Sequence, residues 1–119
     1  MFVSYVELHC HSAYSFLDGA SLPDELAVAA ARHGYGALAL TDHDGLHGAM
    51  ELATTVEDDK LDLRPIVGAE LTMEDGAHLT LLCETRAGYS NLCRLITEAH
   101  AGTRPNPGRE PLARRSRLA

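Results

Sequence analysis

Histidine and aspartate side chains are concentrated in two short segments of this chain. His9 and His11 are separated by one residue, and Asp42 and His43 stand within Thr41–Asp44. Each segment follows a short apolar run that predicts a β-strand, and side chains that follow successive strands of an α/β fold meet in one cleft. Neutral imidazoles and carboxylates are ligands of divalent cations, so the first expectation is a metal site.

Two further acids could complete such a site. Side chains two residues apart on an extended segment point to the same side, which suits His9 and His11 as a pair of ligands. Asp18 follows after a loop long enough to fold back, and Glu70 stands near the end of a third predicted strand. A pair of cations about 3.5–4 Å apart clamps a phosphoryl group and activates water for attack. The alternative interpretation is that these polar residues only cap helices and turns.

Length and composition limit the class of protein. A chain of 119 residues can form one small domain but is too short for a closed eight-stranded barrel, which needs about 250 residues. No segment approaches the roughly 20 apolar residues of a membrane span, and the first residues lack the basic start of a secretory signal. Three cysteines, an odd number, fit a reducing cytoplasm better than a disulfide framework. We therefore expect a cytoplasmic protein without membrane association.

The charge is uneven along the chain. The net charge is −7, but residues 1–103 carry five basic and sixteen acidic side chains, whereas residues 104–119 carry five arginines and one glutamate. An acidic body binds a phosphate backbone poorly on its own, because that affinity comes mainly from Lys and Arg. From residue 103 onward, prolines and arginines without periodicity predict a tail or linker over 103–119. The domain is expected to occupy residues 1–102.

The remaining sequence alternates between predicted strands and helices, which is typical of a parallel α/β architecture. Strands are predicted at Tyr5–Leu8, Ala37–Leu40, Arg64–Leu71 and His78–Cys83. Helices are predicted from Pro23 to His33, over Leu46–Val56 and over Gly88–His100. Proline in the first turn and a glycine after the last residue mark the bounds of the first helix.

Six stretches, in this order, resemble the PHP (polymerase and histidinol phosphatase) domain. They are Glu7-Leu-His-Cys-His-Ser, Ser15-Phe-Leu-Asp-Gly, Ala39-Leu-Thr-Asp-His, Arg64-Pro-Ile-Val-Gly-Ala-Glu, His78-Leu-Thr-Leu-Leu and Gly88-Tyr-Ser-Asn-Leu. The resemblance covers residues 5–101 and is greatest to the N-terminus of bacterial C-family DNA polymerases of the error-prone type. It implies the N-terminal part of a distorted (β/α)7-type barrel, with three to four strands and outer helices.

The resemblance also implies roles for single residues. The ligands of a trinuclear centre would be His9, His11, Asp18, His43, Glu70 and His78. Asp42 would have a catalytic role by orienting His43 or a water. The implied cofactors are two or three Zn, Mn or Fe ions, and the implied chemistry is phosphoester hydrolysis, including 3′-to-5′ removal of nucleotides. DNA, reached through a parent polymerase of replication or repair, and other polymerase domains or subunits would be the partners.

The position of His78 depends on the resemblance, because by pattern it begins a strand whereas the other ligands end theirs. The Asp75-Gly76 turn could make the following strand an antiparallel return that brings His78 back toward Glu70. The family's barrel continues with further strands and ligands that this chain lacks, so the chain resembles a truncated domain and whether it is active alone stays open. The other possibilities are a stand-alone phosphatase of histidinol-phosphatase type and a non-catalytic structural module.

Overall fold

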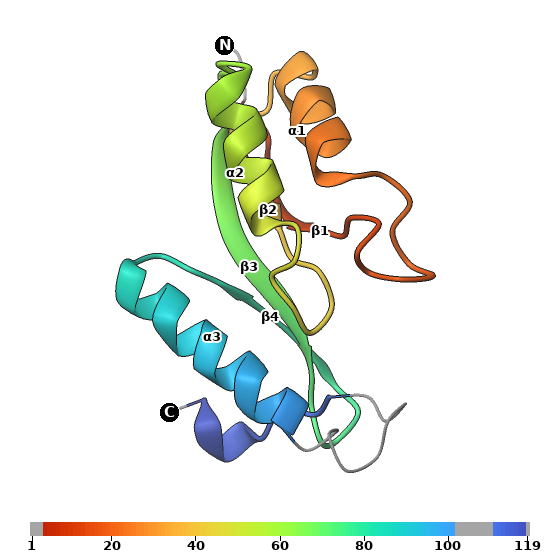
Figure 1. Cartoon of the computed structure of the whole chain (residues 1–119), viewed down its shortest axis with the longest axis vertical. Coiled ribbons are helices and arrows are strands. Elements are labelled where there is room, and N and C mark those ends of the chain that lie inside the picture. Colours follow the sequence, from red (N-terminus) through yellow and green to blue (C-terminus); the bar gives the residue numbers. More distant parts are fainter. Residues whose placement is uncertain (1–3, 102–110, 119) are drawn as a thin grey trace.

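The computed structural model describes residues 4–101 and 111–118. The strands there are β1 (Val6–Cys10), β2 (Ala37–Leu40), β3 (Arg64–Thr72) and β4 (His78–Leu82). The helices are α1 (Pro23–Arg32), α2 (Ala49–Asp58), α3 (Arg86–Ala101) and the short 3-10 helix η1 (Arg115–Arg117). The four strands form one curled sheet in the order β1-β2-β3-β4, with helices packed on it (Figure 1). The predicted α/β class, a curled half-barrel with outer helices, is confirmed.

Strand β3 connects two hydrophobic cores. In Figure 1 it runs most of the length of the molecule, with α1 and α2 at one end and α3 at the other. The first core contains Ala27, Ala30, Leu38, Leu40, Leu52 and Leu63, which come from α1, β2, α2 and the approach to β3. The second core contains Ala69, Leu71, Met73, Leu92, Ala99 and Ala113. Alternate residues of β3 face this second core, so Glu70 between them faces the other side of the sheet.

The order of strand pairing follows from the connections. The pairs β1–β2 and β2–β3 are parallel and each is joined through a helix, as the alternating pattern predicts. The β3–β4 pair is antiparallel and places Thr72 opposite His78 and Glu70 opposite Thr80. Gly76 adopts a left-handed φ of 82° in the turn between them. The antiparallel return that the Asp-Gly turn suggested is confirmed.

Strand β2 has the bounds that the sequence predicts, and helix α1 ends at Arg32, one residue before the predicted His33. Pro23 opens α1, and the Glu25 carboxylate accepts the Leu22 backbone N–H at 2.8 Å. Gly34, with a φ of 74°, ends the helix, and the N–H of Tyr35 then reaches the Ala30 carbonyl at 3.0 Å. This is the usual way in which glycine satisfies the last carbonyls of a helix.

Two helices begin at other residues than predicted. Helix α2 starts at Ala49 instead of Leu46, because Leu46 packs against the second core and is followed by a turn that leaves Gly48 as the N-cap. Helix α3 starts at Arg86 instead of Gly88, because the Thr85 hydroxyl accepts the Gly88 N–H at 3.0 Å and so caps the helix earlier. The first strand also extends two residues further than predicted, to Cys10.

Part of the predicted tail contacts the domain. Ala113 is buried and forms a parallel bridge with Met73, and its N–H donates to the Thr72 carbonyl at 2.8 Å. Nη2 of Arg115 lies 2.7 Å from Oδ2 of Asp75 in the β3–β4 turn. Residues 102–110 lie outside the described residues, so the boundary near residue 102 stays a prediction. None of the helices in the described part is long and apolar enough to cross a bilayer.

Candidate metal centre

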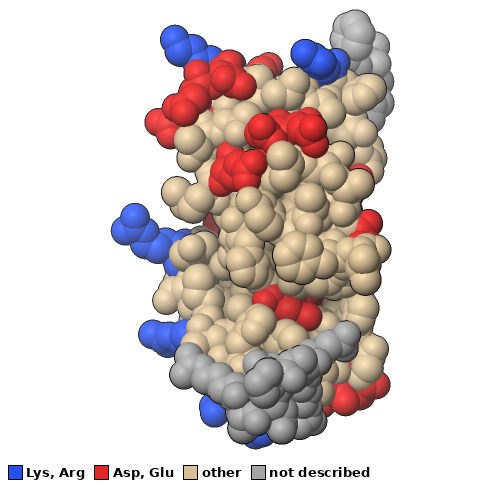
Figure 2. Space-filling model, turned by 45° about the vertical axis from the view of Figure 1, so that its right-hand side comes forward, with Lys and Arg blue, Asp and Glu red and all other residues tan. Residues whose placement is uncertain are grey.

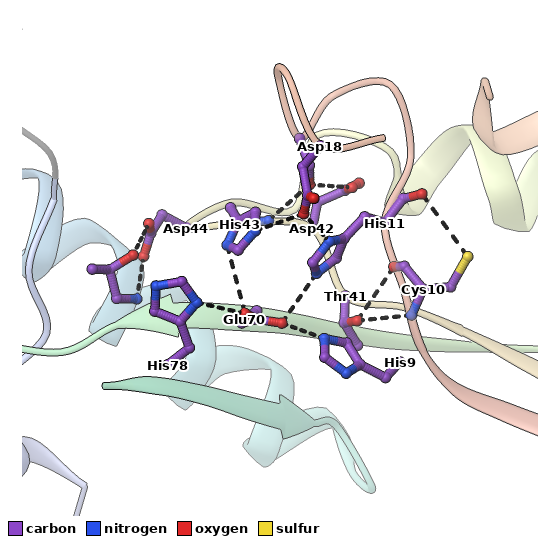
Figure 3. Close-up of polar contacts among 12 residues, drawn as sticks. His9, Cys10, His11, Asp18, Thr41, Asp42, His43, Asp44, Glu70 and His78 are labelled. Carbon is purple, nitrogen blue, oxygen red and sulfur yellow. Dashed lines mark hydrogen bonds and ion pairs between the residues drawn. The ribbon is translucent and has the colours of Figure 1, made fainter. Parts of the chain in front are cut away.

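Six side chains from four strand ends and one loop meet on the face of the sheet opposite the helices (Figure 3). They form three overlapping triads, and within each triad one ligand atom per residue lies within 4.8 Å of the others. The triads are His9–His11–Glu70, His11–Asp18–His43 and His43–Glu70–His78. All six residues predicted as metal ligands are therefore close together, and three of them belong to two triads.

Glu70 lies at the centre of the cluster, with a side chain only 7% exposed. Its Oε2 contacts His9 Nε2 and lies 3.0 Å from His11 Nε2, while its Oε1 lies 2.8 Å from His78 Nδ1. Burial alone raises the pKa of this carboxyl, but the hydrogen bonds to the three imidazoles outweigh it and the net pKa lies below the usual 4.5. Glu70 is therefore ionised at neutral pH.

Asp18 completes the loop side of the cluster. Its Oδ2 lies 2.5 Å from His11 Nδ1 and 3.0 Å from His43 Nε2. Hydrogen bonds to His43 and then His11 lower the pKa of the Asp18 carboxyl below 3.8. The side chain is half exposed, so this end of the cluster is open to solvent.

Four imidazoles follow one another across the site. Ring centroids are 5.1 Å apart for His9 and His11, 4.4 Å for His11 and His43, and 5.3 Å for His43 and His78. Rings this close repel one another when all are protonated, whereas neutral rings present lone pairs toward the same space. Imidazole nitrogens and carboxylate oxygens in this arrangement form a donor set that fits divalent metal cations.

A bulge in β1 helps to aim the first two imidazoles. Glu7 pairs with Leu38 and Cys10 pairs with Leu40, so three steps on β1 match two on β2. Such bulges redirect side chains and are common beside functional sites. Cys10, between the two histidines, packs against the first core, and burial raises the pKa of its thiol.

Asp42 holds the loop after β1 in place and makes no polar contact with an imidazole among the described residues. It is 2% exposed. Its Oδ1 accepts the Ser12 N–H at 2.6 Å and the Ser15 hydroxyl at 2.7 Å, and its Oδ2 accepts the Ser12 hydroxyl at 2.7 Å. The Ser15 oxygen in turn accepts the His43 backbone N–H at 3.0 Å. Asp42 therefore acts on His43 through Ser15 and not by direct contact.

Glycine is required in the same loop. A Cβ on Gly19 would overlap the Ser12 carbonyl, so only glycine allows this close approach. The Ser15 carbonyl accepts both the Asp18 and the Gly19 N–H, at 3.0 and 2.9 Å. The loop is thus closed by short-range backbone bonds and fastened to Asp42, which sets the position of Asp18.

Asp44 joins the loop after β2 to β3. Its carboxylate accepts the N–H and the hydroxyl of Thr72, at 2.8 and 2.7 Å. The residue adopts a left-handed φ of 52°. Its carbonyl accepts Nε2 of His100 at 2.6 Å, which ties α3 to this loop. The partners Thr72, Ser15 and His100 were not found from sequence, because long-range hydrogen bonds leave no spacing signal.

Comparison with known proteins agrees with this geometry. The model of the PHP domain family matches residues 7–117. The error-prone DNA polymerase of Symbiobacterium thermophilum is 52% identical over 103 residues, which is 87% of this chain and 9% of that protein. Error-prone DNA polymerases of other bacteria match at 41–49% identity. The chain therefore spans about a tenth of the length of these curated relatives.

Two solved structures share the fold. An amidohydrolase from Chromobacterium violaceum, solved with bound sulfate and no metal, has a TM-score of 0.64 and 30% identity, over 82% of this chain and 34% of that one. A candidate metal-dependent phosphoesterase from Bifidobacterium adolescentis has a TM-score of 0.55 and 23% identity, over 82% of this chain and 35% of that one. The match over residues 7–117, together with the convergent histidines, shows that the chain belongs to the PHP domain family.

Proposed function

We propose that this chain is the N-terminal part of the PHP domain of an error-prone-type DNA polymerase and that its histidine cluster binds cations for phosphoester hydrolysis. The observation that carries the proposal is the convergence of three overlapping triads of imidazoles and carboxylates. The substrate class proposed is a DNA 3′ end, from which nucleotides are removed in the 3′-to-5′ direction. The relatives that are DNA polymerases support DNA as the partner.

Each triad would hold one cation. The first cation would take His9, His11 and Glu70, the second His11, Asp18 and His43, and the third His43, Glu70 and His78. Three protein ligands per cation leave open positions, as catalytic metal sites require. When bound, such cations supply positive charge to a phosphoryl group and activate water for in-line attack.

The chain's own residues prepare the site in two ways. Glu70 and Asp18 are ionised at neutral pH because the pKa of each carboxyl is lowered by its imidazole neighbours, so both are ready to act as ligands. Asp42 is a positioning residue in this proposal, since its carboxylate is occupied by Ser12 and Ser15. Through these hydrogen bonds it fixes the backbone of the loop after β1, which carries His11 and Asp18.

The identity and number of the metal ions, the partners and the location are also part of the proposal. Zn, Mn or Fe suit a mixed imidazole and carboxylate donor set, and two or three ions would fill the complete domain. Other domains or subunits of the parent polymerase would be further partners, and the location would be the cytoplasm.

Metal analysis of the purified chain tests the proposal. We expect two or more Zn, Mn or Fe ions per chain, and a melting temperature that falls when a chelator removes them, since binding stabilises the folded state. His9→Ala and His43→Ala should lower the metal content and the melting temperature together. His33→Ala is the matched control, because His33 is an exposed histidine at the end of α1.

Two outcomes would contradict the proposal. Unchanged metal content in both cluster variants would remove the assigned ligands. Less than one ion per chain, with a melting temperature that a chelator does not alter, would favour a structural module. The isolated chain is expected to hydrolyse a 3′-ended oligonucleotide weakly at most, because the family's barrel has further strands and ligands.

A further inference from the structure

Two large apolar side chains stand in solvent directly beside the cluster. Phe16 is 84% exposed and Leu17 is fully exposed, in the loop between β1 and α1. They come immediately before Asp18, whose carboxylate contacts His11 and His43. Consecutive Cα atoms are about 3.8 Å apart, so the Cα of Phe16 lies within about 7.6 Å of that of Asp18. Because both side chains are exposed, they are not part of the hydrophobic core. Phe16 and Leu17 are called the loop tip below.

The loop tip is held in a strained conformation and is not loose. Leu17 has a φ of 66°, which is unfavourable for a residue that carries a Cβ. Ser15 on one side is buried and bonded to Asp42, and Gly19 on the other side packs against the Ser12 carbonyl. Backbone strain that is kept by surrounding contacts is typical of ligand-binding positions. In this conformation the side chains of Phe16 and Leu17 are exposed to solvent.

The charges near the cluster indicate what that contact is. Every ion pair within the cluster joins an imidazole to a carboxylate, and no described Lys or Arg takes part. In the face shown in Figure 2, the blue Lys and Arg side chains project at the outline of the molecule. Among the described residues, the cluster therefore has no basic side chain paired with it that could also bind a phosphate. The uncharged part of the ligand is a further source of binding energy.

A nucleobase supplies such an uncharged part. Aromatic side chains bind bases by stacking on the π-face, and apolar neighbours add contact area. We propose that Phe16 and Leu17 form the contact surface for the nucleobase of the nucleotide whose phosphate lies at the cluster. This inference rests on the proposed function and adds to it the two residues that contact the base of the bound nucleotide.

Calorimetric titration of the Mn²⁺-loaded 119-residue chain tests the loop tip. The two probes are deoxyadenosine 5′-monophosphate and inorganic phosphate, which differ by the nucleoside alone. Phe16→Ala should weaken binding of the nucleotide about 5- to 100-fold and leave phosphate binding within about twofold. Phe16→Trp should restore nucleotide binding, because it keeps an aromatic face. Leu17→Asn, which tolerates the left-handed backbone, should weaken nucleotide binding less than Phe16→Ala.

The controls separate this inference from the function on which it rests. Tyr89→Ala removes an exposed aromatic residue on α3 and should change neither affinity. Metal content should stay at the wild-type level in every loop-tip variant. If phosphate binds but Phe16→Ala leaves nucleotide binding intact, or weakens both probes equally, the inference is wrong and the proposed function stands. If phosphate does not bind to the Mn²⁺-loaded wild-type chain, the proposed function itself fails.

Discussion

The two halves of the cluster are held in place by different means. His9, His11, Asp18 and His43 form the amino-terminal half-site, and Glu70 and His78 form the hairpin half-site. The first stands largely on loops that are fastened by the buried carboxylate of Asp42. The second stands on adjacent strands whose antiparallel ladder runs from Gly68 opposite Leu82 to Thr72 opposite His78. The loop residues of the cluster are thus held by a buried acceptor, whereas Glu70 and His78 are placed by the register of paired strands.

Glu70 is where the two half-sites meet, so its replacement should have the largest effect on metal binding. Glu70→Gln keeps the size of the side chain but removes the charge that faces His9, His11 and His78. We expect the metal content to fall to about one ion per chain, because Glu70 belongs to two of the three triads and the third lacks it.

Elemental analysis of Glu70→Gln beside Glu74→Gln checks this expectation. Glu74 is exposed in the β3–β4 turn and pairs only with Arg114 among its described neighbours. A Glu70→Gln variant with wild-type metal content would show that each half-site binds its cations independently.

The amino-terminal half-site should be the more fragile of the two in the absence of metal. Asp42→Ala leaves the Ser12 N–H and the Ser12 and Ser15 hydroxyls without their buried acceptor. We expect a loss of roughly 3–5 kcal/mol in the free energy of unfolding, because buried donors to a charged acceptor are costly to strand. Urea unfolding of the metal-free chain measures it.

Asp62→Ala provides the matched control, since Asp62 is an exposed aspartate before β3. An equal and small effect of both substitutions would remove the distinction drawn between loop-held and strand-held ligands.

Asp44 and Thr72 join the two half-sites. The loss of stability on removing their contact should lie between the losses expected for Asp42 and Asp75. Asp44→Ala removes the acceptor of two hydrogen bonds from Thr72, with an expected cost of about 1–3 kcal/mol. Asp44→Asn should cost less, because asparagine keeps an acceptor and tolerates the left-handed φ.

A double-mutant cycle with Thr72→Val measures how much of this cost belongs to the pair. A coupling energy near zero would mean that the two half-sites are joined mainly by backbone bonds, such as that from Glu70 N–H to the Asp42 carbonyl.

The same contrast explains what sequence could predict. Strand β2 was predicted at its observed bounds and helix α1 to within one residue, because buried apolar runs, proline and glycine act locally. Five of the six clustered residues follow from the α/β pattern of strand ends and loops, whereas His78 was indicated by the family resemblance alone. The hydrogen bonds from Ser12 and Ser15 to the Asp42 carboxylate were not predicted, because they join residues about thirty positions apart. The contact of residues 111–118 with the hairpin was not predicted either, since a buried Ala113 carries no periodic signal.

The smallest effect is expected at the turn of the hairpin half-site, where Asp75 accepts the Ala77 N–H at 3.0 Å and pairs with Arg115. These contacts, the backbone bond first, lower the pKa of the Asp75 carboxyl below 3.8. A carboxyl whose pKa is lower in the folded state stabilises the fold above the unfolded value, and this contribution is lost as the pH falls through the folded pKa.

The free energy of unfolding of Asp75→Asn should therefore be lower than that of the wild type at neutral pH. The two values should approach each other as the pH falls below about 3.8. Acid titration of the unfolding free energy, with Asp62→Asn as control, follows the difference between the two curves. The difference should be small because Asp75 is half exposed and water screens its pairing with Arg115. A difference that persists unchanged through the acid range would mean that the turn is held by geometry alone. The position of His78 would then depend on the β3–β4 hydrogen bonds and not on the charge of Asp75.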